Sequence, residues 1–235
     1  MTEKTPLIML PGLLCDAALW APQCAALTDI ADCRVANMTQ DDSITGMAER
    51  VLADAPERFA LAGLSMGGYC ALEIMRLAPE RIDKLALLDT SAEPDTADRT
   101  AIRVEWVAQA RQGMADFDAV IDLHIPMYLH PDRLADTVIT DRIRASARNV
   151  GIDGYARNQT AIAGRRDQRG NLAAIGCPTL VLCGRQDGAT PPALHEALAE
   201  GISGAKLVVI ENCGHLSTLE QPVAVNTALR HWLED

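Results

Sequence analysis

Apolar and polar positions follow two patterns along this chain. Short apolar runs bounded by turn residues are typical of strands buried on both faces, whereas apolar residues spaced three and four apart are typical of helices. Six runs are predicted to be strands, over residues 6–10, 34–36, 59–62, 82–88, 178–183 and 206–210. Strands that alternate with helices predict a parallel sheet covered on both faces.

Helical spacing fills most of the connections between these strands. Ser43 is expected to cap one helix, and Thr190 another that has Pro191 at its first position. Helices are predicted over residues 20–27, 43–53, 69–78, 191–200 and 222–233.

The pattern changes between Ser91 and about Gly170. This stretch has long helical segments rich in Arg and Asp, and it has no strand signal. We therefore predict an α/β core made of residues 1–90 and 171–235, interrupted by a helical cap over residues 91–170.

A G-x-S-x-G motif follows the third predicted strand. It reads Gly63-Leu64-Ser65-Met66-Gly67 and leads into a helix, which is the strand, turn, helix context that a nucleophile elbow requires. A turn this sharp strains the serine backbone and is tolerated only beside residues with little or no side chain. It lifts the serine hydroxyl above the strand, where the N–H groups of the next helix would stabilise negative charge.

Two further reactive residues follow later strands. Asp187 lies on the loop after residues 178–183, and His215 lies on the loop after residues 206–210. A histidine can take and return the serine proton, and a carboxylate fixes its tautomer, so Ser65, Asp187 and His215 are the candidate triad, in the expected chain order. Asp89 is a competing acid, because it also ends a strand.

An oxyanion formed at Ser65 needs two N–H donors. The backbone N–H of Met66 is the first candidate, and that of Leu13, in the turn after the first strand, is the second. The cysteines resemble core residues, and no His and Cys cluster has the spacing of metal ligands, so no metal site is predicted.

Composition and net charge narrow the classes of protein to which the chain can belong. A chain of 235 residues, 49% of them hydrophobic, is long enough for one domain without disulfides or metals. The net charge of −11 disfavours binding to nucleic acid or to an anionic membrane surface, and no apolar run reaches the length of a membrane span. Seven cysteines without C-x-x-C spacing favour free thiols and a cytoplasmic location.

With these residues in place, the chain resembles the α/β-hydrolase fold superfamily over nearly its whole length. The resemblance is greatest to small bacterial esterases and 3-oxoadipate enol-lactone hydrolases. It is carried by LPGLLCDAALW, GLSMGG, PTLVLCGRQDGATPP and ENCGHLSTLEQP.

The resemblance implies the α/β-hydrolase fold, the Ser65, Asp187 and His215 triad, an oxyanion hole at Leu13 and Met66, a helical cap and no cofactor. Two features depart from many relatives. Pro11-Gly12 stands where they carry His-Gly, and the first strand starts by Pro6 without a preceding hairpin, so a sheet of about six strands is expected.

The predicted cap is expected to shape the substrate pocket. Its candidate pocket residues are Trp106, His124, Met127, Tyr128 and Tyr155, although helical spacing also suits each of them to the cap interior. The segment closes with four charged residues, Arg165, Arg166, Asp167 and Arg169. A solvated hinge is favoured there over an arginine that holds a substrate carboxylate.

The favoured function is a serine hydrolase that cleaves small carboxylic esters or lactones through an acyl-enzyme. A carbon–carbon hydrolase, a lyase or an acyltransferase on the same fold is the first alternative, and a ligand-binding protein with little turnover is the second. A small-molecule substrate is the expected partner, with no nucleic acid and no membrane. A homodimer is compatible with the sequence.

Overall fold

A computed structural model describes residues 4–235. Its sheet contains six parallel strands in the order β2-β1-β3-β4-β5-β6. The strands are β1 (Thr5–Leu10), β2 (Ala31–Val35), β3 (Phe59–Leu64), β4 (Ile82–Leu88), β5 (Thr179–Gly184) and β6 (Lys206–Ile210). The predicted fold class and strand number are therefore confirmed.

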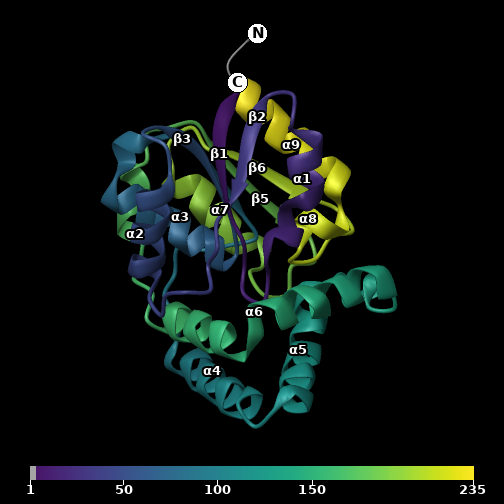
Figure 1. Cartoon of the computed structure of the whole chain (residues 1–235). Helices are drawn as coiled ribbons and strands as arrows, with labels where there is room; N and C mark the ends of the chain where they lie inside the picture. The colour runs from purple at the N-terminus through teal and green to yellow at the C-terminus, as the bar shows by residue number, and fades with distance from the viewer. Residues whose placement is uncertain (1–3) are drawn as a thin grey trace.

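Helices cover both faces of this sheet. In Figure 1, α1 and α9 lie together on one side, and α2 and α3 lie on the other. The helices around the sheet are α1 (Ala21–Ala26), α2 (Ile44–Asp54), α3 (Met66–Leu77), α7 (Pro192–Gly201), α8 (Ser217–Glu220) and α9 (Pro222–Glu234). The inner strands β3 and β5 are buried at every position, because both of their faces are covered.

Three longer helices connect β4 to β5. They are α4 (Ala97–Ala110), α5 (Met114–Tyr128) and α6 (Thr137–Ala163), and they pack on one another. Figure 1 shows them together at the end of the sheet opposite the two chain termini. α6 consists of two helical stretches joined at Gly151, where φ is 71°. No strand occurs between β4 and β5, all of which lies within the described residues.

Short 3-10 helices complete the connections. They are η1 (Ala17–Trp20), η2 (Pro79–Arg81), η3 (Pro131–Arg133) and η4 (Arg169–Ala174). The predicted helix over residues 20–27 is divided between η1 and α1. Ser43 caps α2 as predicted, its hydroxyl accepting a hydrogen bond from the Gly46 N–H at 3.1 Å.

One predicted helix cap is wrong. α7 begins one residue later than predicted, at Pro192, and Pro191 occupies the N-cap position. The hydroxyl of Thr190 donates instead to Asp187 Oδ2 at 2.8 Å. This hydrogen bond to a carboxylate takes the side chain away from the helix end.

Candidate active site

The turn between β3 and α3 holds Ser65 in a strained backbone conformation, with φ 56° and ψ −114°. A β-carbon on Gly63 would lie 2.3 Å from the Gly67 oxygen, and one on Gly67 would lie 2.1 Å from the Leu10 oxygen. Both positions therefore exclude any side chain. The same close packing presents the Ser65 hydroxyl at the carboxyl end of the sheet.

The side chains of Ser65, His215 and Asp187 form one chain of hydrogen bonds. His215 Nε2 lies 2.9 Å from Ser65 Oγ. Its Nδ1 lies 2.8 Å from Asp187 Oδ2 and 2.9 Å from Oδ1. Three residues predicted from separate loops are thus brought into contact.

Asp187 is buried, and both of its carboxylate oxygens accept hydrogen bonds. The backbone N–H groups of Ala189 and Thr190 each donate to its Oδ1 at 2.8 Å. Burial alone would raise the pKa of Asp187, but the charge of His215 and these hydrogen bonds lower it below its usual value. The carboxylate is therefore ionised where it meets the imidazole.

His215 is buried beneath the end of α5. Its backbone N–H donates to the Tyr128 oxygen at 2.8 Å, and the Tyr128 ring stacks on its imidazole with centroids 5.4 Å apart. Burial disfavours the charged imidazole, but the Asp187 carboxylate outweighs burial and raises the pKa of His215 above 6.5. Its position therefore depends on both the sheet and the helical segment.

Asp89, the competing acid, has no hydrogen bond to His215. Its Oδ1 accepts from the Gly184 N–H at 3.2 Å, and its Oδ2 accepts from the Ser217 hydroxyl at 2.5 Å. Burial and the nearby charge of Asp187 hold the pKa of Asp89 well above its usual value. Asp89 therefore connects two loops, the one that leads to Asp187 and the one that carries His215.

Two backbone N–H groups adjoin the serine. Within residues 4–235, neither the Leu13 N–H nor the Met66 N–H has a hydrogen-bond acceptor. Met66 is the first residue of α3, where helical N–H groups have no partner inside the helix. The turn that carries Leu13 also abuts the serine, because a β-carbon on Gly12 would lie 3.3 Å from Ser65 Cβ.

A cavity of about 320 Å³ lies over Ser65 and His215. Four of the five pocket residues predicted from the sequence line it, namely Trp106, His124, Met127 and Tyr128. The fifth, Tyr155, does not. Its ring is fully buried against Phe117, with centroids 5.6 Å apart, because α6 presents this side chain to the interior of the helical segment.

The sequence prediction missed further lining residues, of which three lie on α4. Arg99, Ile102 and Arg103 line the cavity together with Trp106. Their spacing of three and four residues places them on one helix face, so this pattern could have identified them. The Arg103 guanidinium donates hydrogen bonds to Asp95 Oδ2 at 2.5 Å and to Gln159 Oε1 at 2.6 Å.

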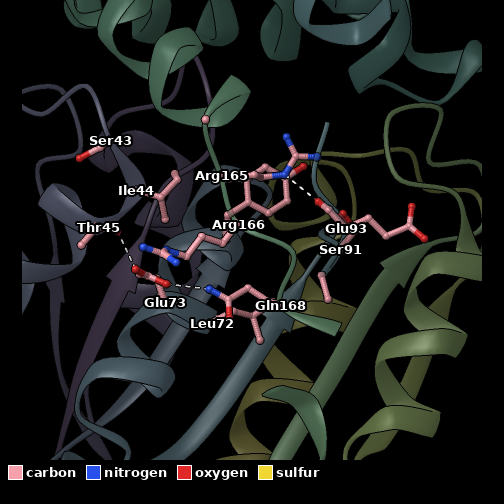
Figure 2. Close-up of a pocket in the computed structure, with 13 residues that line it drawn as sticks. Ser43, Ile44, Thr45, Leu72, Glu73, Ser91, Glu93, Arg165, Arg166 and Gln168 are labelled. Carbon is pink, nitrogen blue, oxygen red and sulfur yellow. Dashed lines mark hydrogen bonds between the residues drawn. The ribbon is translucent and has the colours of Figure 1, made fainter. Parts of the chain in front are cut away.

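A second cavity, of about 220 Å³, lies beside the first and is shown in Figure 2. Tyr69 lines both cavities. Glu73 is buried in its wall and accepts hydrogen bonds from Thr45 and Gln168, as the dashed lines in Figure 2 show. The hydrogen bond from Arg76, aided by these two donors, lowers the pKa of Glu73 to about 2 against the effect of burial.

The favoured solvated hinge over residues 165–169 is wrong at Arg165. This side chain is buried, and it donates to Glu93 O at 2.8 Å and to Asp95 Oδ1 at 2.5 Å. Its guanidinium also lies 4.4 Å from the centre of the Tyr69 ring. Arg169 and Asp167 do form an exposed pair. Residues 165–169 are all absent from the lining of the cavity over Ser65.

The sequence profile of the Alpha/beta hydrolase family matches residues 10–228. The chain belongs to this family. A relative from Rhizobium rhizogenes named "Putative carbamate hydrolase RutD" is 30% identical, and the match covers 98% of this chain and 93% of that protein.

Two solved structures share this α/β-hydrolase fold. The enol-lactonase from Burkholderia xenovorans LB400 is 26% identical, with a TM-score of 0.90, over 99% of this chain and 92% of that one. A thermophilic esterase from Thermogutta terrifontis is 28% identical, with a TM-score of 0.88, over 99% of this chain and 90% of that one.

The described part of this α/β hydrolase has neither a membrane-spanning helix nor a cluster of metal ligands. Among residues 4–235, no helix is long and apolar enough to cross a membrane. Over the same residues, no group of three or more His, Cys, Asp or Glu side chains is placed to hold a metal ion.

Proposed function

We propose that the protein is a serine hydrolase that cleaves small carboxylic esters or lactones through an acyl-enzyme. The observation that carries the proposal is the continuous hydrogen-bonded chain from Ser65 Oγ through His215 to Asp187. A serine hydroxyl becomes a useful nucleophile when a base accepts its proton, and His215 Nε2 lies at the required distance.

In the first half of the reaction, Ser65 Oγ attacks the substrate carbonyl while its proton passes to His215 Nε2. The charge of Asp187 stabilises the imidazolium that forms, and Asp187 accepts the Nδ1 hydrogen bond that orients the ring. The Leu13 and Met66 N–H groups are the proposed donors to the oxyanion. Collapse of the intermediate breaks the ester bond, and His215 returns the proton to the leaving alkoxide.

In the second half, water attacks the acyl-enzyme. His215 accepts a proton from this water and returns it to Ser65 Oγ when the acyl–oxygen bond breaks, which releases the acid and restores the resting side chains. A lactone follows the same steps, except that its alcohol and acid remain in one product.

The substrate class is supported by the site and by the relatives. The cavity over Ser65 is small, at about 320 Å³, and its lining mixes aromatic and aliphatic side chains with a few polar ones. Relatives named as an esterase and an enol-lactonase share the fold and about a quarter of the sequence. The relative named as a carbamate hydrolase makes carbamates a second class to assay, because the same nucleophile can attack their carbonyl.

The proposal is tested by hydrolysis of p-nitrophenyl esters from acetate to long acyl chains. We expect turnover of the short esters, and Ser65→Ala is expected to lose at least about a thousandfold in kcat, because no other group replaces the nucleophile. Ser203→Ala, a change at an exposed serine, is the matched control and is expected to behave as the wild type. Equal activity of Ser65→Ala and wild type would overturn the proposal.

A further inference from the structure

One buried polar atom next to the cavity over Ser65 has no hydrogen-bond partner. Among residues 4–235, four buried side-chain atoms are in this position, and His124 Nε2 is one of them. The others belong to Trp20, Gln23 and Thr218. Gln23 and Thr218 are in contact, because Gln23 Nε2 donates to the Thr218 backbone oxygen at 3.2 Å. Only His124 also lines the cavity over Ser65. A buried polar atom without a hydrogen bond destabilises the fold, so its presence beside the cavity requires an explanation.

The structure determines which hydrogen bond this atom can make. His124 Nδ1 lies 2.8 Å from the Val120 oxygen, which can only accept, so Nδ1 carries the ring proton. Burial lowers the pKa of His124 to about 4, and the ring is therefore neutral at neutral pH. Nε2 then presents a lone pair and can only accept a hydrogen bond.

The ring lies in a row of aromatic groups that leads to the proposed base. Its centroid is 4.5 Å from Trp106 and 5.7 Å from Tyr128, and Tyr128 stacks on His215 at 5.4 Å. His124 is thus two ring contacts away from His215. Trp106 is only partly buried, whereas His124 and Tyr128 are buried.

We propose that His124 Nε2 accepts a hydrogen bond from a hydroxyl or N–H group of the substrate and selects substrates that carry such a donor away from the scissile bond. This rests on the proposed hydrolase function. A carboxylate cannot satisfy Nε2, because it offers only acceptors at neutral pH. The substrate reaches the atom by displacing the Trp106 ring, and the pairing adds to binding at the end of the cavity formed by α4 and α5.

The rival explanation is that His124 serves only to pack the helical segment. His124→Phe separates the two, because it keeps an aromatic ring in the row and removes the acceptor. His124→Gln is the matched variant, because its side-chain oxygen restores an acceptor near the position of Nε2.

The experiment measures kcat/KM for pairs of esters in which a methyl group replaces one hydroxyl. Methyl ω-hydroxyalkanoates are compared with methyl alkanoates, and ω-hydroxyalkyl acetates with alkyl acetates, so that either half of the ester can face α5. We expect the preference for the hydroxylated member of one series to fall about tenfold in His124→Phe, the effect of one neutral hydrogen bond, and to recover in His124→Gln. The melting temperature of His124→Phe is expected to equal or exceed that of the wild type.

An unchanged preference in His124→Phe, across both series, would overturn the inference while leaving the hydrolase proposal intact. If no ester is hydrolysed, the hydrolase proposal fails and binding decides the inference. Tryptophan fluorescence then gives Kd for alkanediols and for the alcohols in which a methyl group replaces one hydroxyl. The inference is supported if the wild type binds the diol more tightly than the alcohol and His124→Phe does not. It is contradicted if His124→Phe weakens the binding of both ligands equally or changes neither.

Discussion

At the scale of single residues, Ser65 is held in its strained conformation by contacts from several sides. The Ser65 backbone N–H donates to the Leu88 carbonyl oxygen at 2.9 Å, and the Ser65 backbone carbonyl oxygen accepts from the Thr90 hydroxyl at 2.8 Å. Such a backbone costs about 1–3 kcal/mol and persists only where the surroundings impose it. The motif predicted this turn from local spacing, but Thr90 lies in another segment and carries no local signal.

The pH dependence of hydrolysis should report His215. Its pKa lies above 6.5 because of Asp187, and only the neutral ring can accept the Ser65 proton. We expect kcat/KM to fall as the pH is lowered through this raised pKa, with the midpoint above pH 6.5. Asp187→Asn removes the charge, so the midpoint should move to lower pH while kcat falls about 10⁴-fold. A flat profile between about pH 5 and 8 would count against His215 as the base.

Asp89 should tolerate an amide. Burial raises the pKa of its carboxyl well above the usual value, which favours the neutral form, and Asn is a neutral group of the same shape. We expect Asp89→Asn to keep kcat within about threefold of wild type, since the group only joins two loops. Asp89→Ala should lower the free energy of unfolding by about 2 kcal/mol, because the Gly184 N–H and Ser217 lose their partner. A loss of activity in Asp89→Asn as large as that of Asp187→Asn would identify Asp89 as a catalytic acid.

At the scale of elements, apolar runs predicted the buried strands well, because both of their faces are covered. The edge strand β2 was predicted over residues 34–36 but spans Ala31–Val35, and its burial alternates along the chain. α8 was missed, because four residues are too few to show helical spacing. The sequence predicted helices between β4 and β5, but not which residues of α4–α6 would reach the cavity, since that depends on how these helices pack.

Arg165 should stabilise the start and end of the segment between β4 and β5. We expect Arg165→Met to lower the free energy of unfolding by about 3 kcal/mol, because it leaves the buried Asp95 with a single remaining partner, Arg103. Urea denaturation measures this difference. Arg169→Met is the control, since its pair with Asp167 is exposed and should contribute less than about 1 kcal/mol. Equal effects of the two substitutions would show that the buried contacts of Arg165 add nothing.

At the scale of the whole molecule, strand order determines where the site forms. The chain runs from β1 to the edge strand β2 and then returns to β3 on the other side of β1. Such a reversal opens a crevice at the carboxyl ends of neighbouring strands, and the turn after β1 meets Ser65 there. The sequence indicated a parallel sheet and its approximate size, but local patterns do not specify the order of strands, which depends on contacts between distant segments.

The segment between β4 and β5 also leaves and rejoins the core at nearly the same place. The Gln168 N–H donates to Ala92 O at 2.9 Å, so the long excursion through α4, α5 and α6 begins and ends at neighbouring backbone groups. A loop closed in this way can lengthen, shorten or be exchanged between relatives with little disturbance of the strands that anchor it. Evolution can therefore alter what enters the cavity by replacing parts of this excursion, provided that the contacts of Tyr128 with His215 are kept.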